Sequence, residues 1–428
     1  MKTVEYPRLG ETLHKTVLEN GLTVAVVPRP GFTKKMAYFV TDFGSIHTEF
    51  ELDGVRHRVP AGVAHFLEHK MFDMPDGRDV SAQLASLGAG VNAFTSYDIT
   101  AYYVVCTENF RECLKTLVEF VSTPYFTKES VQKEMGIIDQ EIGMNLDAPD
   151  SQVFEELMGC LFHRHPIRVP ILGTSETIRE ITPEILYTCH RAFYTPGNMI
   201  LCVVGDVDPQ EVADIATEVL GTQCRSVGKK YLPDPEEMTV VQPETCCAME
   251  VAMPTFELGF KCEDAGWGRE SVKKEIIGDL AAEALFGEAS QLYLELYEEG
   301  LIDGSFGGGY ETTEGVSMLF CGGDSDDPEA VRDAVLKRAA ELAETGMDQA
   351  EFLRMKRSAM GRRIRDLDSF DSTCFRVCAH HLSKFDYFEF PGLYEEVTVE
   401  EIQEFLGRCV REERASLSII EPLAEEEA

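Results

Sequence analysis

Hydrophobic positions along the first half of the chain recur with helical spacing in some segments and as short apolar runs in others. Apolar residues three and four positions apart predict amphipathic helices, and short runs rich in β-branched and aromatic residues predict strands. Strands are therefore expected between residues 22 and 50. They should be followed by helices at 61–72 and 80–87, strands at 91–96 and 100–107, helices at 110–121, 129–146, 152–162 and 183–193, a strand at 199–204 and a helix at 209–220.

The second half repeats this order loosely, with strands around 248–256 and 307–321 and helices at 272–286, 291–299, 328–344 and 349–366. Strands and helices that segregate within each half predict an α+β fold. We expect two duplicated domains, each a mainly antiparallel sheet with helices packed on one face. A chain of 428 residues is also too long for one ordinary core. The proline-rich, charged segment 222–243 reads as a linker between a domain at 1–221 and a domain at 244–428.

The predicted helix at 61–72 contains the sequence H-x-x-E-H, formed by His65, Glu68 and His69. Histidines four residues apart lie on one face of a helix, where two neutral imidazoles can bind one metal ion. Glu68 lies on the flank of that face, close enough to act on an attacking water without being a ligand. A free carboxylate in that place is what metal-assisted hydrolysis requires.

A third ligand is expected on another helix, because catalytic zinc usually keeps three protein ligands. Glu134 and Glu141 are seven residues apart in the predicted helix at 129–146, so they lie two turns apart on one face. Two acids along a half-buried stripe are costly unless a cation or hydrogen bonds satisfy them. The spacing alone leaves alternatives open: His65 as a hydrogen-bonded core histidine, and the two glutamates as solvated surface residues.

Together these features resemble the pitrilysin/insulinase family of zinc metallopeptidases, the inverzincins, and its processing-peptidase-like branch. The segments 20–24 (Asn-Gly-Leu-Thr-Val), 90–96 (Gly-Val-Asn-Ala-Phe-Thr-Ser) and 194–208 extend the resemblance over most of residues 15–220. It implies one Zn²⁺ per chain with His65, His69 and Glu141 as ligands, Glu68 as general base and Glu134 as supporting acid. The 72 positions from His69 to Glu141 (141 − 69) are slightly fewer than the family has, which a loop deletion explains.

The resemblance also implies a zinc-dependent endopeptidase that acts on short or unfolded peptides. The peptide would lie extended along the predicted strand at 91–96, beside Asn92, Ala93 and Phe94. Main-chain hydrogen bonds would hold it there by strand addition, so recognition would depend weakly on the peptide's sequence. Two other functions stay open: a non-catalytic peptide-binding or scaffold subunit of a processing complex, and a zinc hydrolase of a non-peptide amide.

The second half departs from the family in one run. Many members carry Leu-Arg-Glu-x-x-Gly-Leu-x-Tyr there, and its arginine and tyrosine help to hold and polarise the substrate. The corresponding run of this chain, residues 296–303, is one residue shorter: counted from Leu296, Tyr297 stands at the arginine position, and counted from Gly300, Asp303 stands at the tyrosine position. We therefore predict that this protein is the zinc-bearing subunit of a bacterial paired peptidase, whose homologous partner lacks the zinc motif and supplies the clamp. A homodimer is the competing arrangement.

The amino-acid composition further limits the kinds of partner and cellular compartment that are expected for this protein. A net charge of −36, from 39 basic and 75 acidic residues, argues against nucleic acid as a partner, because phosphates need a basic face. The chain has no apolar run of 18 residues and no apolar signal core, so no membrane span and a cytoplasmic location are expected. The 13 cysteines have scattered spacings that suit a reducing compartment. Cys106, Cys160, Cys189, Cys202 and Cys321 lie in apolar surroundings and are expected to be buried.

Overall fold

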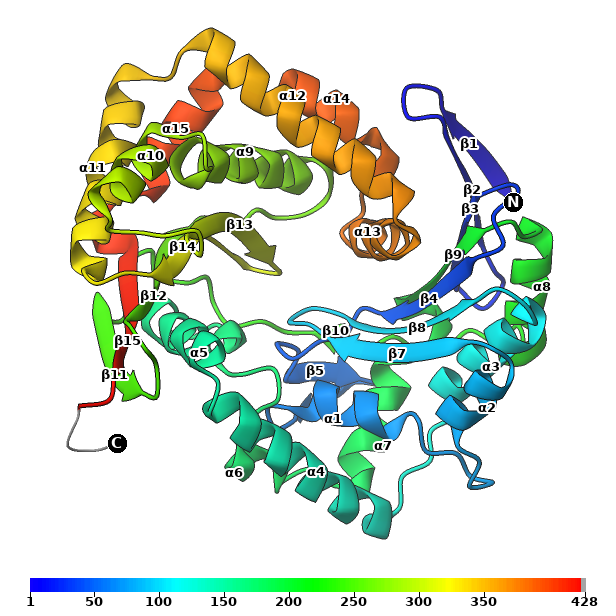
Figure 1. Ribbon diagram of the computed structural model, residues 1–428. Coiled ribbons are helices and arrows are strands. Elements are labelled where there is room, and N and C mark those ends of the chain that lie inside the picture. The colour runs from blue at the N-terminus through cyan, green and yellow to red at the C-terminus, as the bar shows by residue number, and fades with distance from the viewer. Residues whose placement is uncertain (425–428) are drawn as a thin grey trace. The chain divides into compact units, whose positions relative to one another are not determined.

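The computed structural model describes residues 1–424 and divides into two compact units (Figure 1). Each unit is assembled from separate stretches of the chain. Unit 1 contains Met1–Ile142, Pro170–Leu232 and Arg363–Glu389, and unit 2 contains Gly143–Val169, Pro233–Arg362 and the chain from Phe390 onward. Each unit is built on its own β-sheet with helices, so the predicted α+β class is confirmed. The proposed boundaries at 221/222 and 243/244 stay a prediction.

Unit 1 is built on a seven-stranded sheet with the strand order β1-β2-β3-β9-β4-β8-β7. All neighbours are antiparallel except β3 and β9, which are parallel. Strand β7 forms one edge of this sheet. The strands are β1 (Lys2–Tyr6), β2 (Glu11–Val17), β3 (Thr23–Pro28), β4 (Lys35–Thr41), β7 (Gly90–Thr95), β8 (Thr100–Cys106) and β9 (Met199–Gly205). A second, small sheet contains β5 (Glu49–Leu52), β6 (Val55–Arg58) and β10 (Lys229–Lys230).

The main core of unit 1 lies between one face of the seven-stranded sheet and a layer of helices. Strand residues such as Val24, Phe39 and Leu201 pack there against helix residues such as Phe66 and Leu117, all fully buried. The helices of unit 1 up to residue 220 are α1 (Val63–Lys70), α2 (Val80–Ser86), α3 (Phe110–Ser122), α4 (Lys128–Leu146, which ends in unit 2), α6 (Ser175–Ile178), α7 (Pro183–Phe193) and α8 (Pro209–Leu220).

A further helix, α13 (Phe370–Leu382), was not included in the predicted layer of helices on one face of the sheet. It packs against β4 and β9 through side chains that do not belong to the main core. The hydroxyl of Tyr38 in β4 donates a 2.6 Å hydrogen bond to Asp371 of α13. Cys202 of β9 and Cys374 of α13 are both fully buried in this contact. Helices therefore cover both faces of this sheet.

Unit 2 is built on a five-stranded sheet with the order β11-β15-β12-β14-β13. Its strands are β11 (Glu244–Met249), β12 (Thr255–Cys262), β13 (Gly307–Thr313), β14 (Val316–Asp324) and β15 (Ala415–Pro422). Helix α5 (Pro149–Leu161) packs against β12 and β15, and Gly259 permits this contact because a Cβ there would lie 2.8 Å from Leu161. The other helices are α9 (Gly268–Phe286), α10 (Gln291–Glu299), α11 (Pro328–Thr345), α12 (Gln349–Arg365, which ends in unit 1), α14 (Phe390–Glu396) and α15 (Val399–Cys409).

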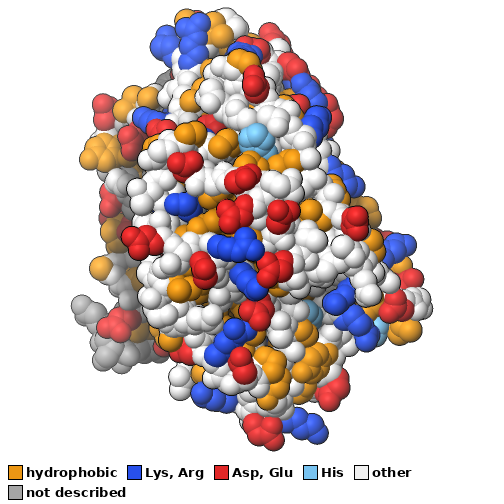
Figure 2. Space-filling model, turned by 90° about the vertical axis from the view of Figure 1, so that its right-hand side faces the viewer, with side chains coloured by type: hydrophobic (Ala, Val, Ile, Leu, Met, Phe, Trp, Pro, Cys, Tyr) orange, Lys and Arg blue, Asp and Glu red, His pale blue; other side chains and the backbone are white. Residues whose placement is uncertain are grey.

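Charged side chains of both signs are interspersed on the face of the molecule drawn in Figure 2. Among the ion pairs of unit 1, Glu218 of α8 binds Arg111 at 3.0 Å and Lys115 at 2.6 Å, both from α3. The excess of acid in the composition is therefore not expressed there as one uniform patch. The cysteines predicted to be buried, Cys106, Cys160, Cys189, Cys202 and Cys321, are buried and free.

Candidate metal centre

Helix α1 carries the H-x-x-E-H sequence and is fixed tightly within unit 1. Its N-cap residue, Gly62, has a φ of 87°, which favours glycine. A Cβ on Gly62 would also lie 2.4 Å from the carbonyl oxygen of Leu172, so no larger residue fits between the helix and that segment. Phe66 and Leu67 are fully buried in the core. Because the helix is anchored by these buried residues, the side chains of His65, Glu68 and His69 point in fixed directions.

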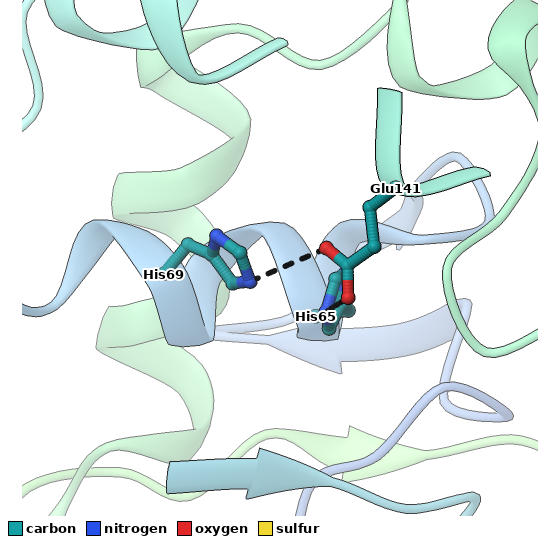
Figure 3. A group of neighbouring side chains, drawn as sticks. All are labelled: His65, His69 and Glu141. Atoms are coloured by element: carbon teal, nitrogen blue, oxygen red, sulfur yellow. Dashed lines mark ion pairs between the residues drawn. The ribbon is translucent and has the colours of Figure 1, made fainter. Parts of the chain in front are cut away.

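Helices α1 and α4 bring the predicted ligands together (Figure 3). Nε2 of His65 lies 3.6 Å from Oε1 of Glu141, and Nε2 of His69 lies 3.7 Å from Oε2 of the same carboxylate. One ligand atom from each of the three residues lies within 4.8 Å of the others. Ligands at about 2.0–2.1 Å from a tetrahedral zinc lie roughly 3.4 Å apart, so the arrangement fits a zinc ion after small adjustments.

The protonation state of His65 also suits metal binding. The side chain is 9% exposed, and this burial lowers its pKa to about 4, with a further contribution from the neighbouring His69. The imidazole is therefore neutral near pH 7 and its contact with Glu141 is not an ion pair. A neutral imidazole and a carboxylate can each donate an electron pair to a metal ion, as metal ligands must.

Glu134 lies behind His69 and orients it. Oε1 of Glu134 is 3.0 Å from Nδ1 of His69. An ionised carboxylate accepts a hydrogen bond, so Nδ1 carries the proton and Nε2 is left free to coordinate. Hydrogen bonding to Glu134 raises the pKa of His69, while burial opposes that rise. The predicted supporting acid thus lies where a carboxylate behind a ligating histidine is usually found.

Lys70 is a member of this cluster that the sequence pattern did not single out. It directly follows His69, and its side chain is 2% exposed. Nζ of Lys70 lies 3.5 Å from Oε2 of Glu134 and also contacts Asp73. Burial alone would raise the pKa of Glu134, but the hydrogen bond with His69 and the positive charge of Lys70 outweigh it, so the pKa is lowered. Glu134 therefore stays ionised.

Glu68 faces a different partner. Its side chain is buried, and its Oε2 accepts a 2.8 Å hydrogen bond from the hydroxyl of Thr95 at the end of β7. Burial raises the pKa of Glu68, and the hydrogen bond from Thr95 opposes that rise. A carboxylate with a raised pKa is a better proton acceptor near neutral pH. Thr95 was not predicted as a site residue, although it follows the predicted substrate strand residues in the sequence.

The three residues predicted to bind substrate lie on β7, at the edge of the seven-stranded sheet. Asn92 is exposed, and Ala93 and Phe94 are partly buried. The backbone N–H of Ala93 is bonded to the side chain of Asn92 at 2.9 Å. Because the N–H of Ser96 bonds to the carbonyl of Ile99, Ala93 and Tyr102 form a non-hydrogen-bonded pair, and the N–H of Ala93 points away from β8. Helix α1 packs beside this strand. An edge strand next to the candidate metal centre can accept a further strand.

Two family models match this chain, one in each half. Residues 54–175 match the model described as "Insulinase (Peptidase family M16)", and residues 180–359 match "Peptidase M16 inactive domain". The chain is also 35% identical to a protein of Bacillus subtilis (strain 168) named "Uncharacterized zinc protease YmfH", over 99% of both chains. This protein belongs to the insulinase family of peptidases, family M16. The resemblance stated from the sequence is therefore confirmed.

Two further relatives are consistent with this assignment. The crystal structure of an M16-like peptidase from Alicyclobacillus acidocaldarius superposes with a TM-score of 0.93 at 32% identity, covering 98% of this chain and 100% of that one. The two-domain fold is thus shared. A protein named "Probable mitochondrial-processing peptidase subunit beta, mitochondrial" from Arabidopsis thaliana is 27% identical over 264 residues, which are 59% of this chain and 47% of that one.

The candidate metal centre lies in the half that matches the insulinase model. Within residues 1–424, His65, His69 and Glu141 are the group of histidines, cysteines and acids close enough to hold a metal ion. His380 and His381, the adjacent histidines of α13, are engaged elsewhere: His380 contacts Arg363 at 2.8 Å, and His381 contacts Lys15 at 3.0 Å. Over the same residues, no helix is both long and apolar enough to cross a lipid bilayer.

Proposed function

We propose that this member of family M16 is a zinc-dependent endopeptidase that hydrolyses peptide bonds in short or unfolded peptides. One observation carries the proposal: His65, His69 and Glu141 converge, with Glu134 supporting His69 and Glu68 left outside the ligand group. The kinship with proteins named zinc proteases supports zinc as the metal. We propose one Zn²⁺ per chain.

Zinc held by these three residues would supply a Lewis acid that polarises a scissile carbonyl and acidifies a water. Glu68 would take the proton of the attacking water and pass it to the leaving amine. Oε2 of Glu68 accepts the hydrogen bond from Thr95, which leaves Oε1 for this work. Glu134 would keep the proton of His69 on Nδ1 throughout the reaction.

The substrate would bind along β7 as an added strand. The outward N–H of Ala93 is available after release from the Asn92 side chain, and it would donate to a peptide carbonyl. Backbone recognition of this kind suits a substrate that is extended, and a folded protein cannot present it. Asn92, Ala93 and Phe94 are the residues that we assign to this contact.

A homologous partner subunit would complete the site. In unit 2, Tyr297 lies on α10 with 55% of its surface exposed, and Asp303 accepts hydrogen bonds from the backbone and hydroxyl of Ser305. Neither side chain can supply the positive charge of the family's arginine. We therefore propose that the clamp comes from a second chain that lacks the zinc motif, with a homodimer as the alternative assembly. A cytoplasmic location is part of the same proposal.

The alternative function, a non-catalytic scaffold subunit, has one observation in its favour: residues 180–359 match a family model described as an inactive domain. The converged group in the other half favours catalysis instead. A scaffold has no need of two histidines that both contact one carboxylate.

Digestion of a library of unfolded peptides tests this function. The protein should be assayed alone and with a clamp-bearing homologue, before and after metal removal by a chelator. We expect cleavage to disappear on chelation and to return when one equivalent of zinc is added. Glu68→Gln, the control, should bind zinc and cleave nothing. Cleavage that survives both chelation and Glu68→Gln would contradict the proposal, and so would a library left intact by the zinc-loaded pair.

A further inference from the structure

Lys70 is almost fully buried at the C-terminal end of α1, where the proposed chemistry makes no use of it. Its side chain is 2% exposed. Nζ has three oxygen neighbours: a carboxylate oxygen of Asp73, Oε2 of Glu134 at 3.5 Å and the backbone carbonyl of Ser130 at 3.5 Å. Burying an ammonium group is expensive unless its donors are paired in this way. The position of Lys70 therefore depends on both α4 and the turn after α1.

Lys70 and His69 bind the two oxygens of one carboxylate. Oε2 of Glu134 faces Lys70 at 3.5 Å, and Oε1 faces Nδ1 of His69 at 3.0 Å. The side chain of Glu134 is 14% exposed, so water has little access to its carboxylate and cannot fully substitute for Lys70 or His69 as its partner. A carboxylate held at both oxygens cannot rotate about its last bond. The lysine thus determines the direction in which Glu134 presents its other oxygen.

We propose that Lys70 is a positioning residue of the metal centre, which acts through Glu134 to hold His69 in its coordinating orientation. This role rests on the proposed zinc site. It places Lys70 behind Glu134, in the same way that Glu134 lies behind the proposed ligand His69. Lys70 touches neither the metal position nor the substrate strand. Partners behind a metal-ligating histidine typically contribute 10–100-fold to metal affinity. A residue one step further out should contribute about tenfold.

Zinc affinity of the full-length protein tests this directly. Metal-free parent, Lys70→Met, Glu134→Gln and the double variant should each be titrated with zinc against a competing chelator. We expect Lys70→Met to weaken zinc binding about tenfold. In the Glu134→Gln background the same change should have little further effect, because the lysine then has no carboxylate to position. Lys133→Met, which removes an exposed lysine next to Glu134, is the matched control and should bind zinc like the parent.

Thermal unfolding of the metal-free proteins separates positioning from folding. If Lys70→Met does not fold, Lys70→Gln keeps a donor for Asp73 without the charge and is expected to show the same loss of affinity. Parental zinc affinity in a folded Lys70 variant would overturn the inference, and so would equal losses in the presence and absence of Glu134. Failure of the parent itself to bind zinc would instead overturn the proposed zinc site.

Discussion

At the scale of single residues, the proposed general base depends on a hydrogen bond from the substrate strand. Glu68 is buried, and a buried carboxylate needs donors. Thr95 supplies one at 2.8 Å from the end of β7. The base is therefore tied to the strand along which a peptide would lie. A shift of that strand would move Glu68 relative to the scissile bond.

Replacing Thr95 with valine removes this donor while keeping the shape of the side chain. A hydrogen bond to a charged group contributes about 1.5–3 kcal/mol. We expect kcat to fall roughly 10–100-fold, while KM and zinc content stay close to those of the parent. Thr95→Ser keeps the hydroxyl and should retain most of the activity. Steady-state kinetics with metal analysis are the measurement, and a fully active Thr95→Val would show that Glu68 needs no such support.

The pairing of the candidate ligand residues on helix faces could be predicted from the sequence because their spacing is local, whereas the assignment of Glu141 as the ligand rests on the family resemblance and stays a prediction. Residues four or seven positions apart share a helix face, so the spacing alone pairs His65 with His69 and Glu134 with Glu141. Thr95 and Lys70 depend on contacts between separate elements, to Glu68 and Glu134. Such contacts carry no fixed spacing in the chain. Thr95 directly follows the strand residues assigned to the substrate, and Lys70 directly follows His69, which were the available signals.

Among the secondary-structure elements, most helices up to residue 366 were predicted to within a few residues, and elements near the two ends of the chain were not. The predicted helices at 129–146 and 209–220 correspond to α4 (Lys128–Leu146) and α8 (Pro209–Leu220). No element was predicted at strands β1, β2 and β15 or at helices α14 and α15. Helix α13 has cysteines and apolar residues facing the sheet of unit 1, far away in sequence, so its own pattern does not reveal its partner.

Strand β7 is the element whose role can be tested most simply. The N–H of Ala93 is bonded to Asn92 and not to β8, so Ala93→Pro removes an outward donor without removing a bond to β8. We expect peptide cleavage to fall strongly with zinc content unchanged, because the ligands lie on α1 and α4. Ala93→Gly keeps the N–H and should still cleave. Kinetics of the two variants decide the matter: equal activity of Ala93→Pro and parent would remove strand addition from the account.

At the scale of the whole molecule, the chain is a pair of compact units whose segments interleave along the sequence. The order of predicted elements indicated two similar halves, and each unit does have its own sheet. Residues 143–169 nevertheless belong to unit 2 and 363–389 to unit 1. The pattern of apolar side chains indicates which face of a helix or strand is buried, but it does not indicate against which sheet that face packs. This interleaving of segments could therefore not be predicted.

A partner subunit should raise the activity of the isolated chain. Without the arginine–tyrosine clamp, the chain lacks a preorganised donor to the developing oxyanion, a loss of about 2.7–4 kcal/mol or roughly a hundred- to thousandfold in rate. We expect a homologue that keeps the clamp and lacks the zinc motif to restore most of this. Peptide turnover before and after mixing is the measurement. Full turnover by the chain alone, with no gain on mixing, would defeat the split site and favour a self-sufficient chain or homodimer.

The zinc content of two matched variants tests the proposed metal centre without a substrate or a partner. Glu141→Gln and Glu68→Gln make the same chemical change at two carboxylates beside the same histidines. We expect about one zinc per chain in the parent and in Glu68→Gln, and a strong loss of zinc in Glu141→Gln. Retention of zinc by Glu141→Gln together with its loss from Glu68→Gln would contradict the assignment of ligand and base.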